Sequence, residues 1–307
     1  RQVAIEWNPW GFSEENPQVT TDETVLEERT FTEDEIYPAA SITYMTDWWA
    51  ETFQLRLGSS ETAVRPDLRE LTGSSYIDPI TGDLVRGNPG VVPSKVDNID
   101  LRAEWFFGNG DNFTITLFQK DIEDPIEFFE MPASDTTIAR EILNADSSEV
   151  RGIEIEGLKE LAFLGGIFDT MFVQGNLTFQ DTELVPGNPN DPDDTGTTQV
   201  SCFETETQGQ QVSVVKNNCE LSGASEYVAN FMIGFDSYDS KHTASLIYNV
   251  FGERVFAFGR FGPDAIEQPF ESLDLKYFWY PTDRFTVKAK AQNLLGDTIE
   301  ITRSEPG

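Results

Sequence analysis

Short runs of alternating apolar and polar residues are the feature that most restricts how this chain can fold. Residues 96–122 contain two of them, joined by the polar turn at 108–112. Alternate side chains of a strand point to opposite faces, so each run has one apolar and one polar face. A soluble sandwich would bury the apolar face, whereas a membrane barrel would turn it toward lipid. In the first run the apolar face carries Ile99, Leu101, Ala103, Trp105 and Phe107, and the polar face carries Asn98, Asp100, Arg102 and Glu104.

About eleven runs of this kind follow one another, and no long segment repeats at the helical period. The gaps between them are alternately short and long. Short gaps lie near residues 46, 109, 239 and 282, and long ones span roughly 8–35, 59–95, 123–147, 182–224 and 251–267. One edge of the sheet therefore carries tight turns and the other carries large loops. This asymmetry is typical of outer-membrane barrels, and loops above about 15 residues are uncommon in compact soluble domains.

The aromatic and charged residues also favour a membrane barrel. Trp48, Trp49, Phe106, Phe107 and the run 277–280 adjoin the short turns, as in the interfacial girdle of a membrane barrel. The polar faces carry too many charges for the dry interior of a small barrel, and therefore suit a wide lumen. We predict an all-β, antiparallel transmembrane barrel rather than a soluble β-sandwich, with Leu101 facing lipid and Arg102 facing the lumen.

Composition excludes other classes. The formal net charge of -33 argues against a nucleic-acid ligand, because a polyanion repels phosphates. No stretch reaches the roughly 18 consecutive apolar residues of a spanning helix, and the first residues lack the pattern of a signal peptide. Single-chain bacterial barrels have even strand numbers, so we expect residues 1–307 to form one domain that is part of a larger barrel.

Several spaced motifs resemble the barrel of TonB-dependent outer-membrane receptors. They include Arg65-Pro66, Glu70-Leu71 and the spacing from Asp97 through Asp100-Leu101 to Glu104, together with 144–157 and 291–297. The resemblance implies a barrel of about 22 strands, of which this chain would supply about half. It also implies an N-terminal plug and the remaining strands outside this chain, an energising TonB-type complex that acts through the plug, and outer-membrane lipid around the barrel.

The function implied by the resemblance is energy-coupled import of a bulky, scarce nutrient, either a ferric siderophore or an oligosaccharide, at the bacterial outer membrane with the long loops extracellular. The alternatives are a passive or surface-structural barrel and, less favoured, a barrel enzyme. The sequence has no G-x-S-x-G, H-E-x-x-H or phosphate-binding loop. We expect no cofactor, and we interpret the lone His242 as a solvated turn residue rather than a base or ligand.

Scarce cations near aromatic residues are the candidate substrate contacts. Arginine with aromatic rings could grip an anionic chelate or stack on sugar rings, although the same residues could simply pack the loops and pair with acids. The candidates are Arg65, Arg69, Arg254, Phe256, Phe258 and Arg260.

Two further features lie in the loop 182–224. Asp191, Asp193 and Asp194 cluster there and could hold Ca²⁺, but their spacing matches no EF-hand, so a solvated acidic loop is the favoured interpretation. Cys202 and Cys219 allow a single intramolecular pairing. We expect a disulfide, worth about 3 kcal/mol if unstrained, rather than two free thiols.

Overall fold

The fold is known from a computed structural model. It describes residues 2–7, 11–13, 16–20, 27–32, 35–71, 75–79, 82–134, 137–185, 202–205, 213–216, 219–259 and 264–303. Almost all regular structure in these ranges is β-strand, as the period-two pattern predicts. Among the helices described, none has the length and apolar character needed to cross a membrane.

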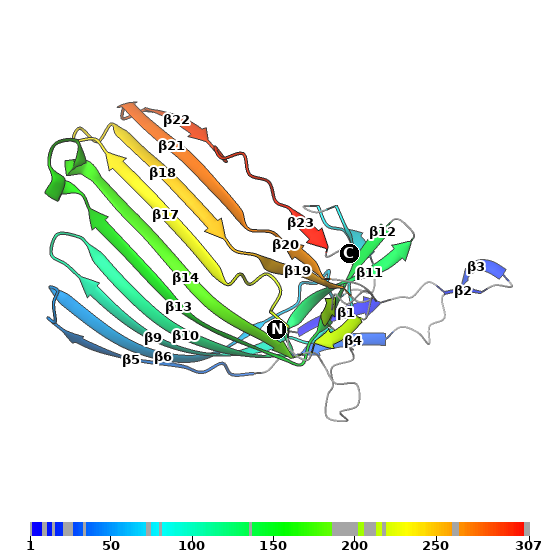
Figure 1. Ribbon diagram of the computed structural model, residues 1–307. Coiled ribbons are helices and arrows are strands. Elements are labelled where there is room, and N and C mark those ends of the chain that lie inside the picture. The colour runs from blue at the N-terminus through cyan, green and yellow to red at the C-terminus, as the bar shows by residue number, and fades with distance from the viewer. Residues whose placement is uncertain are drawn as a thin grey trace.

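The largest element is a curved, antiparallel sheet of ten strands, which we call the barrel sheet (Figure 1). Consecutive hairpins build it, so each strand pairs with its sequence neighbours in the sheet. The sheet is open in this chain, with β22 at one edge and β5 at the other. Its strands are β5 (Ala39–Thr46), β6 (Thr52–Val64), β9 (Ser94–Phe106), β10 (Asn112–Glu123), β13 (Ser147–Glu160), β14 (Met171–Val185), β17 (Tyr227–Asp236), β18 (His242–Phe251), β21 (Phe270–Thr282) and β22 (Phe285–Ala291).

The short connections lie at one end of the barrel sheet (Figure 1). Four of them match the short gaps of the sequence. The fifth, residues 161–170 between β13 and β14, holds the 3-10 helices η2 (Ala162–Leu164) and η3 (Gly166–Thr170) and is not among those predicted. Its apolar residues have no period-two pattern, which is why strand periodicity gives no boundary for it.

A second sheet of seven strands lies at the opposite end, and we call it the loop-end sheet (Figure 1). All of its strands except β23 come from segments predicted as long loops, so several of these connections contain strands of their own. Its order is β23-β20-β19-β11-β12-β8-β7, with β11 parallel to β19 and β12 parallel to β8. The strands are β7 (Ser75–Ile77), β8 (Leu84–Arg86), β11 (Ile126–Ser134), β12 (Thr137–Asn144), β19 (Arg254–Gly259), β20 (Ala265–Glu267) and β23 (Ile301–Arg303).

Three two-stranded sheets complete the described structure. They also lie within predicted loops or next to them. The pairs are β1 (Gln2–Trp7) with β4 (Glu27–Thr32), β2 (Gly11–Ser13) with β3 (Asn16–Thr20), and β15 (Cys202–Thr205) with β16 (Ser213–Lys216).

The two faces of the barrel sheet differ as predicted. On the outer face Leu57, Ile99 and Leu117 are 49%, 53% and 48% exposed. On the inner face Glu104 is only 6% exposed, although it is charged. A soluble protein rarely exposes so extended an apolar surface, and the antiparallel register places Leu57 and Leu117 on either side of Leu101 across the strands. The outer face is therefore built for hydrocarbon.

Aromatic residues gather on this sheet near the short turns. The ring centroid of Phe53 lies 5.1 Å from those of both Trp48 and Trp105. The ring centroids of Trp105 and Phe113 are 5.7 Å apart. Trp105 is half-buried among these rings rather than enclosed in a soluble core. The packed cores lie instead at the loop end, around Phe129 and Phe258 and around Val85 and Ile142.

The two faces give a direct test with neighbouring residues at one depth. We expect Leu101→Arg to lower the free energy of unfolding of the full-length protein in bilayers by about 2–4 kcal/mol, because it buries a charge in hydrocarbon. Asp100→Arg points into the lumen and should cost much less. Denaturant unfolding in lipid vesicles measures both, and equal losses would contradict the assignment of the faces.

Candidate functional site

Charged and amide side chains form a hydrogen-bonded row across the inner face of the barrel sheet. Arg102 is at its centre: its Nε lies 3.0 Å from Glu104 Oε1, and its Nη2 lies 2.9 Å from Glu156 Oε2. Arg56 Nη2 approaches Glu104 Oε2 at 3.5 Å. Register explains the row, because β6, β9, β10 and β13 place these residues at matching or adjacent levels. The pairing compensates part of the desolvation cost of the buried Glu104.

Amide side chains continue this row onto the next strands. Asn176 donates to Glu154 Oε1 at 3.3 Å, and Asn230 donates to Asn176 Oδ1 at 2.9 Å. Beside them the inner face has a hollow of about 350 Å³, lined by Asn112, Glu156, Gln174, Asn176, Asn230 and Met232 among others. The amides of this wall can donate and accept hydrogen bonds and its carboxylate can accept them, so the wall suits a ligand or protein surface rich in hydroxyl or amide groups.

These amides are not among the site residues predicted from the sequence. The alternation within each strand does assign them to the inner face: Gln174, Asn176 and Asn230 occupy the polar phase of their strands, as Glu154 and Glu156 do on β13. What the sequence could not give is which strands are neighbours, and therefore that the polar phases meet in one row.

The predicted substrate residues lie in two groups at the loop end. Arg254, Phe256 and Phe258 share β19. The Arg254 Nε lies 2.8 Å from Glu267 Oε2, and its guanidinium lies 4.2 Å from the Phe251 ring centroid. Phe258 is fully buried and stacks on Phe129 at 5.3 Å. Its surroundings in this structure are those of a core residue.

The second group follows β6. Arg65 lies 5.6 Å from the ring centroid of Tyr37, and Arg69 lies 5.3 Å from that of Tyr76 in β7. Arg69 also approaches Asp67 at 3.8 Å. Tyr76 is in β7, and the loop-end sheet interposes β8, β12 and β11 between β7 and β19, so Arg69 does not meet the residues of β19. Arg260 lies outside the described residues.

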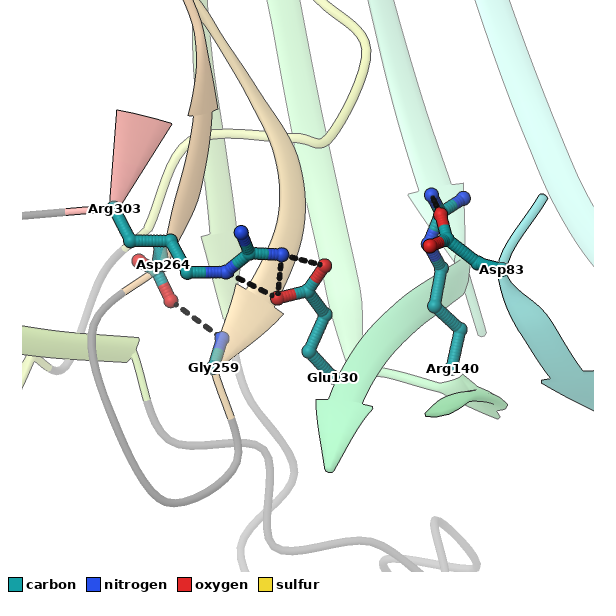
Figure 2. A network of polar contacts seen from close by, with 6 residues as sticks. All are labelled: Asp83, Glu130, Arg140, Gly259, Asp264 and Arg303. Atoms are coloured by element: carbon teal, nitrogen blue, oxygen red, sulfur yellow. Dashed lines mark hydrogen bonds and ion pairs between the residues drawn. The ribbon is translucent and has the colours of Figure 1, made fainter. Parts of the chain in front are cut away.

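Two ion pairs connect distant segments of the loop-end sheet (Figure 2). Arg303 of β23 donates two hydrogen bonds to Glu130 of β11, from Nε to Oε2 at 2.9 Å and from Nη2 to Oε1 at 2.7 Å. Arg140 of β12 pairs with Asp83 beside β8 and stacks over Phe256 at 4.3 Å. Glu130 and Arg140 are 8% and 6% exposed, so each pair is partly shielded from water and couples its segments more strongly than a surface pair would.

Glu127 of β11 is a buried acid in the same sheet, at 1% exposed. Burial raises the pKa of Glu127 from 4.5 to about 7, although hydrogen bonds with the side chain and backbone of Ser222 oppose the shift. One of its carboxylate oxygens, Oε2, has no hydrogen-bond partner among the described residues. Glu127 is thus an acid whose protonated form the fold favours.

His242 is not a solvated turn residue in isolation. It starts β18 and its Nδ1 lies 2.7 Å from the Tyr277 hydroxyl, while its ring is nearly parallel to that of Trp279, with the centroids 6.3 Å apart. These neighbours are aromatic residues of the outer face near the short turns, so the packing is that of an interfacial residue.

Two predictions concern residues that the structure does not describe in full. Asp191, Asp193 and Asp194 lie outside the described residues, so the calcium hypothesis stays a prediction. Among the residues that are described, no cluster of three or more metal-ligating side chains occurs. Cys219 is buried, and its backbone exchanges hydrogen bonds with Leu184. The side chain of Cys202 in β15 is not described, so the disulfide also stays a prediction.

The family of the chain follows from comparison with known proteins. Residues 12–294 match the model of the TonB dependent receptor-like β-barrel family, and the chain belongs to that family. The family is one of bacterial outer-membrane receptors rather than of enzymes. No match to a curated protein sequence was found.

Solved structures resemble this chain at low sequence identity. The copper transporter OprC is 14% identical, with a TM-score of 0.54, over 90% of this chain and 36% of its own. A mutant of the ferric enterobactin receptor PfeA from Pseudomonas aeruginosa is 16% identical, with a TM-score of 0.49, over 84% and 34%. The siderophore receptor PirA from Acinetobacter baumannii is 13% identical, with a TM-score of 0.47, over 84% and 36%. The chain thus spans about a third of these proteins.

The buried acid predicts a pH dependence of the loop-end sheet. The folded-state pKa of Glu127 exceeds its unfolded value of 4.5, so the unfolded state releases its proton first. The free energy of unfolding of the loop-end sheet should therefore fall as pH rises from 4.5 to about 7, by at most about 3 kcal/mol. Glu127→Gln should remove this loss, whereas Glu123→Gln, an exposed acid nearby, should not. Hydrogen exchange of β11 and β12 at acid and alkaline pH measures this loss of stability. Identical pH profiles for the wild type and Glu127→Gln would contradict the prediction.

Proposed function

We propose that the chain forms part of the barrel of an energy-coupled outer-membrane receptor that imports a bulky, scarce nutrient. The observation that carries the proposal is the barrel sheet, with hydrocarbon-facing Leu and Ile on one side and the row around Arg102 on the other. A face that holds hydrogen-bonded charges needs a wet or protein-filled lumen, which is the architecture of a wide, plugged barrel. Membership of the receptor family supports the same function.

We place the loop-end sheet outside the cell and the short turns in the periplasm. Outer-membrane barrels have short periplasmic turns and longer extracellular loops, and the two ends of this sheet differ in that way (Figure 1). Substrate would then meet the loop-end sheet first, near Arg69 and Arg254, before reaching the amide-lined wall. The plug and the energising complex would be partners outside this chain.

The substrate class we favour is an anionic ferric chelate, with an oligosaccharide as the second member. Lys and Arg total 21 against 54 Asp and Glu in this chain, and the Arg69 side chain is 63% exposed beside Tyr76. A guanidinium next to an aromatic ring can bind an anion and stack on a planar group at once. Phe258 is buried and would support β19 rather than touch the substrate.

Energy coupling is tested by uptake into cells that lack their own copy of the gene. We expect the full-length protein to restore uptake of a labelled ferric siderophore or oligosaccharide from a defined panel. A protonophore should abolish that uptake, because the energising complex depends on the inner-membrane proton gradient. Uptake that persists after the gradient collapses would indicate a passive barrel and would contradict the proposal.

A matched pair of arginines tests the substrate contact in the same assay. Arg69→Gln should raise the half-saturating substrate concentration for uptake roughly fivefold, because losing an exposed charged contact weakens binding by about 1 kcal/mol. Arg151→Gln is the control, since its side chain is 61% exposed and lies on β13 of the barrel sheet. Equal binding by both variants would remove Arg69 from the site.

A further inference from the structure

The outer face of the barrel sheet is interrupted by two neighbouring glycines. Gly157 of β13 and Gly175 of β14 are paired in register. The residue paired with Gly157 on the next strand is Phe113, and the residue paired with Gly175 is Phe231. Two phenyl rings therefore bracket two residues without side chains, on a face where the other positions are mostly Leu, Ile, Val and Phe.

This interruption coincides with a hollow of about 820 Å³, within the range of small-molecule sites. We call it the outer groove. Its floor is the glycine backbone, and its apolar walls have the same phase as the lipid-facing residues. They are Phe113, Ile155, Val173, Leu177, Ala229 and Phe231.

One end of the outer groove carries a cation. Lys159 follows Gly157 by two residues, so it has the same phase on β13, and it lines the hollow. It pairs with Asp111, yet its side chain is 50% exposed. Asp111 also accepts from the Asn109 side chain and the Glu160 backbone, both at 2.8 Å. Lys159 can therefore turn to another anion while Asp111 keeps two hydrogen bonds.

The turn beyond Lys159 is apolar. Within 161–170, Phe163, Leu164 and Ile167 are 69%, 55% and 72% exposed, in contrast with the polar turns at 108–111 and 237–241. The Lys159 ammonium lies 5.3 Å from the ring centroid of Phe163. Tyr238 donates to Asp169 at 2.7 Å and connects this turn to a neighbouring one. Exposed apolar side chains beside a cation at the edge of a membrane-facing sheet are suited to the lipid interface.

We propose that the outer groove binds one glycerophospholipid, with an acyl chain over Gly157 and Gly175 and the phosphate at Lys159. Membrane lipid is the occupant because the groove is continuous with the lipid-facing surface, and Lys159 supplies the complementary charge at its end. The apolar turn would hold the interfacial part of the same molecule. That the lipid belongs to the periplasmic leaflet rests on the orientation given under the proposed function, whereas the binding itself does not.

The substitution that fills the groove is Gly157→Leu. A Cβ at this position would lie 3.6 Å from the Asn112 carbonyl oxygen and 3.7 Å from Phe113 Cδ2, which are ordinary contacts. Gly175 is a poorer choice, because its Cβ would approach the Asn230 carbonyl at 3.0 Å. The matched control is Ala103→Leu, which adds bulk to the same face on β9, away from the groove.

Native mass spectrometry of the full-length protein in mild detergent, titrated with dioleoyl phosphatidylglycerol, provides the readout. The wild type and Ala103→Leu should retain one lipid. Gly157→Leu should bind it roughly tenfold more weakly. Lys159→Gln should lose the preference for phosphatidylglycerol over dioleoylglycerol, which lacks the phosphate, and this variant decides the matter if Gly157→Leu does not fold.

Equal lipid retention by all variants would overturn the proposal, as would a second copy of the chain in place of the lipid. Nutrient uptake by Gly157→Leu should stay at the wild-type level. A negative lipid result together with normal uptake therefore refutes the groove alone, whereas lost uptake in the wild type refutes the proposed function.

Discussion

A backbone surrounded by hydrocarbon must pair its own N–H and C=O groups, and the barrel sheet satisfies this requirement by antiparallel pairing between consecutive strands. Most other features of the chain follow from it. Pairing fixes the register, the register fixes the phase of every strand, and the phase puts Leu101 outside and Arg102 inside. The inner row of charges and amides exists because the polar phases of adjacent strands coincide.

The two ends of the barrel sheet are covered in different ways. At the short-turn end, aromatic rings around Trp105 cover the strand ends. At the loop end, the connecting segments form a sheet of their own, with apolar clusters around Phe129 and Ile142. Ion pairs such as that between Arg303 and Glu130 connect segments far apart in sequence. The long connections are thus organised by pairing and packing, which is a requirement for loops that present a defined surface to a ligand.

Sequence periodicity predicts the barrel sheet well because its signal is local. In residues 96–122 the alternation alone assigns each side chain to a face, and the structure confirms the faces. The loop-end sheet is different: β7 and β8 span only Ser75–Ile77 and Leu84–Arg86, too short for a period to appear. Its parallel pairing of β11 with β19 joins residues such as Phe129 and Phe258, and no local pattern encodes so distant a contact.

The candidate site shows the same division. The pairing of Arg with aromatic residues was visible in the sequence, but which of them packs and which stays accessible depends on distant partners. Phe258 is buried because Phe129 lies against it, and Phe256 lies beneath Arg140 of another segment. The outer groove likewise depends on strand pairing, because no local pattern sets Gly157 beside Gly175.

The central claim is that the apolar phase of the barrel sheet faces lipid and the polar phase faces an aqueous or protein-filled lumen. Spin labels placed one at a time along β9 of the full-length protein in bilayers, with Cys202 and Cys219 replaced by Ser, test it directly. Labels at 99, 101 and 103 should collide mainly with oxygen dissolved in lipid. Labels at 98, 100 and 102 should show low oxygen accessibility. Uniform accessibility along the strand, or the opposite phase, would contradict the account.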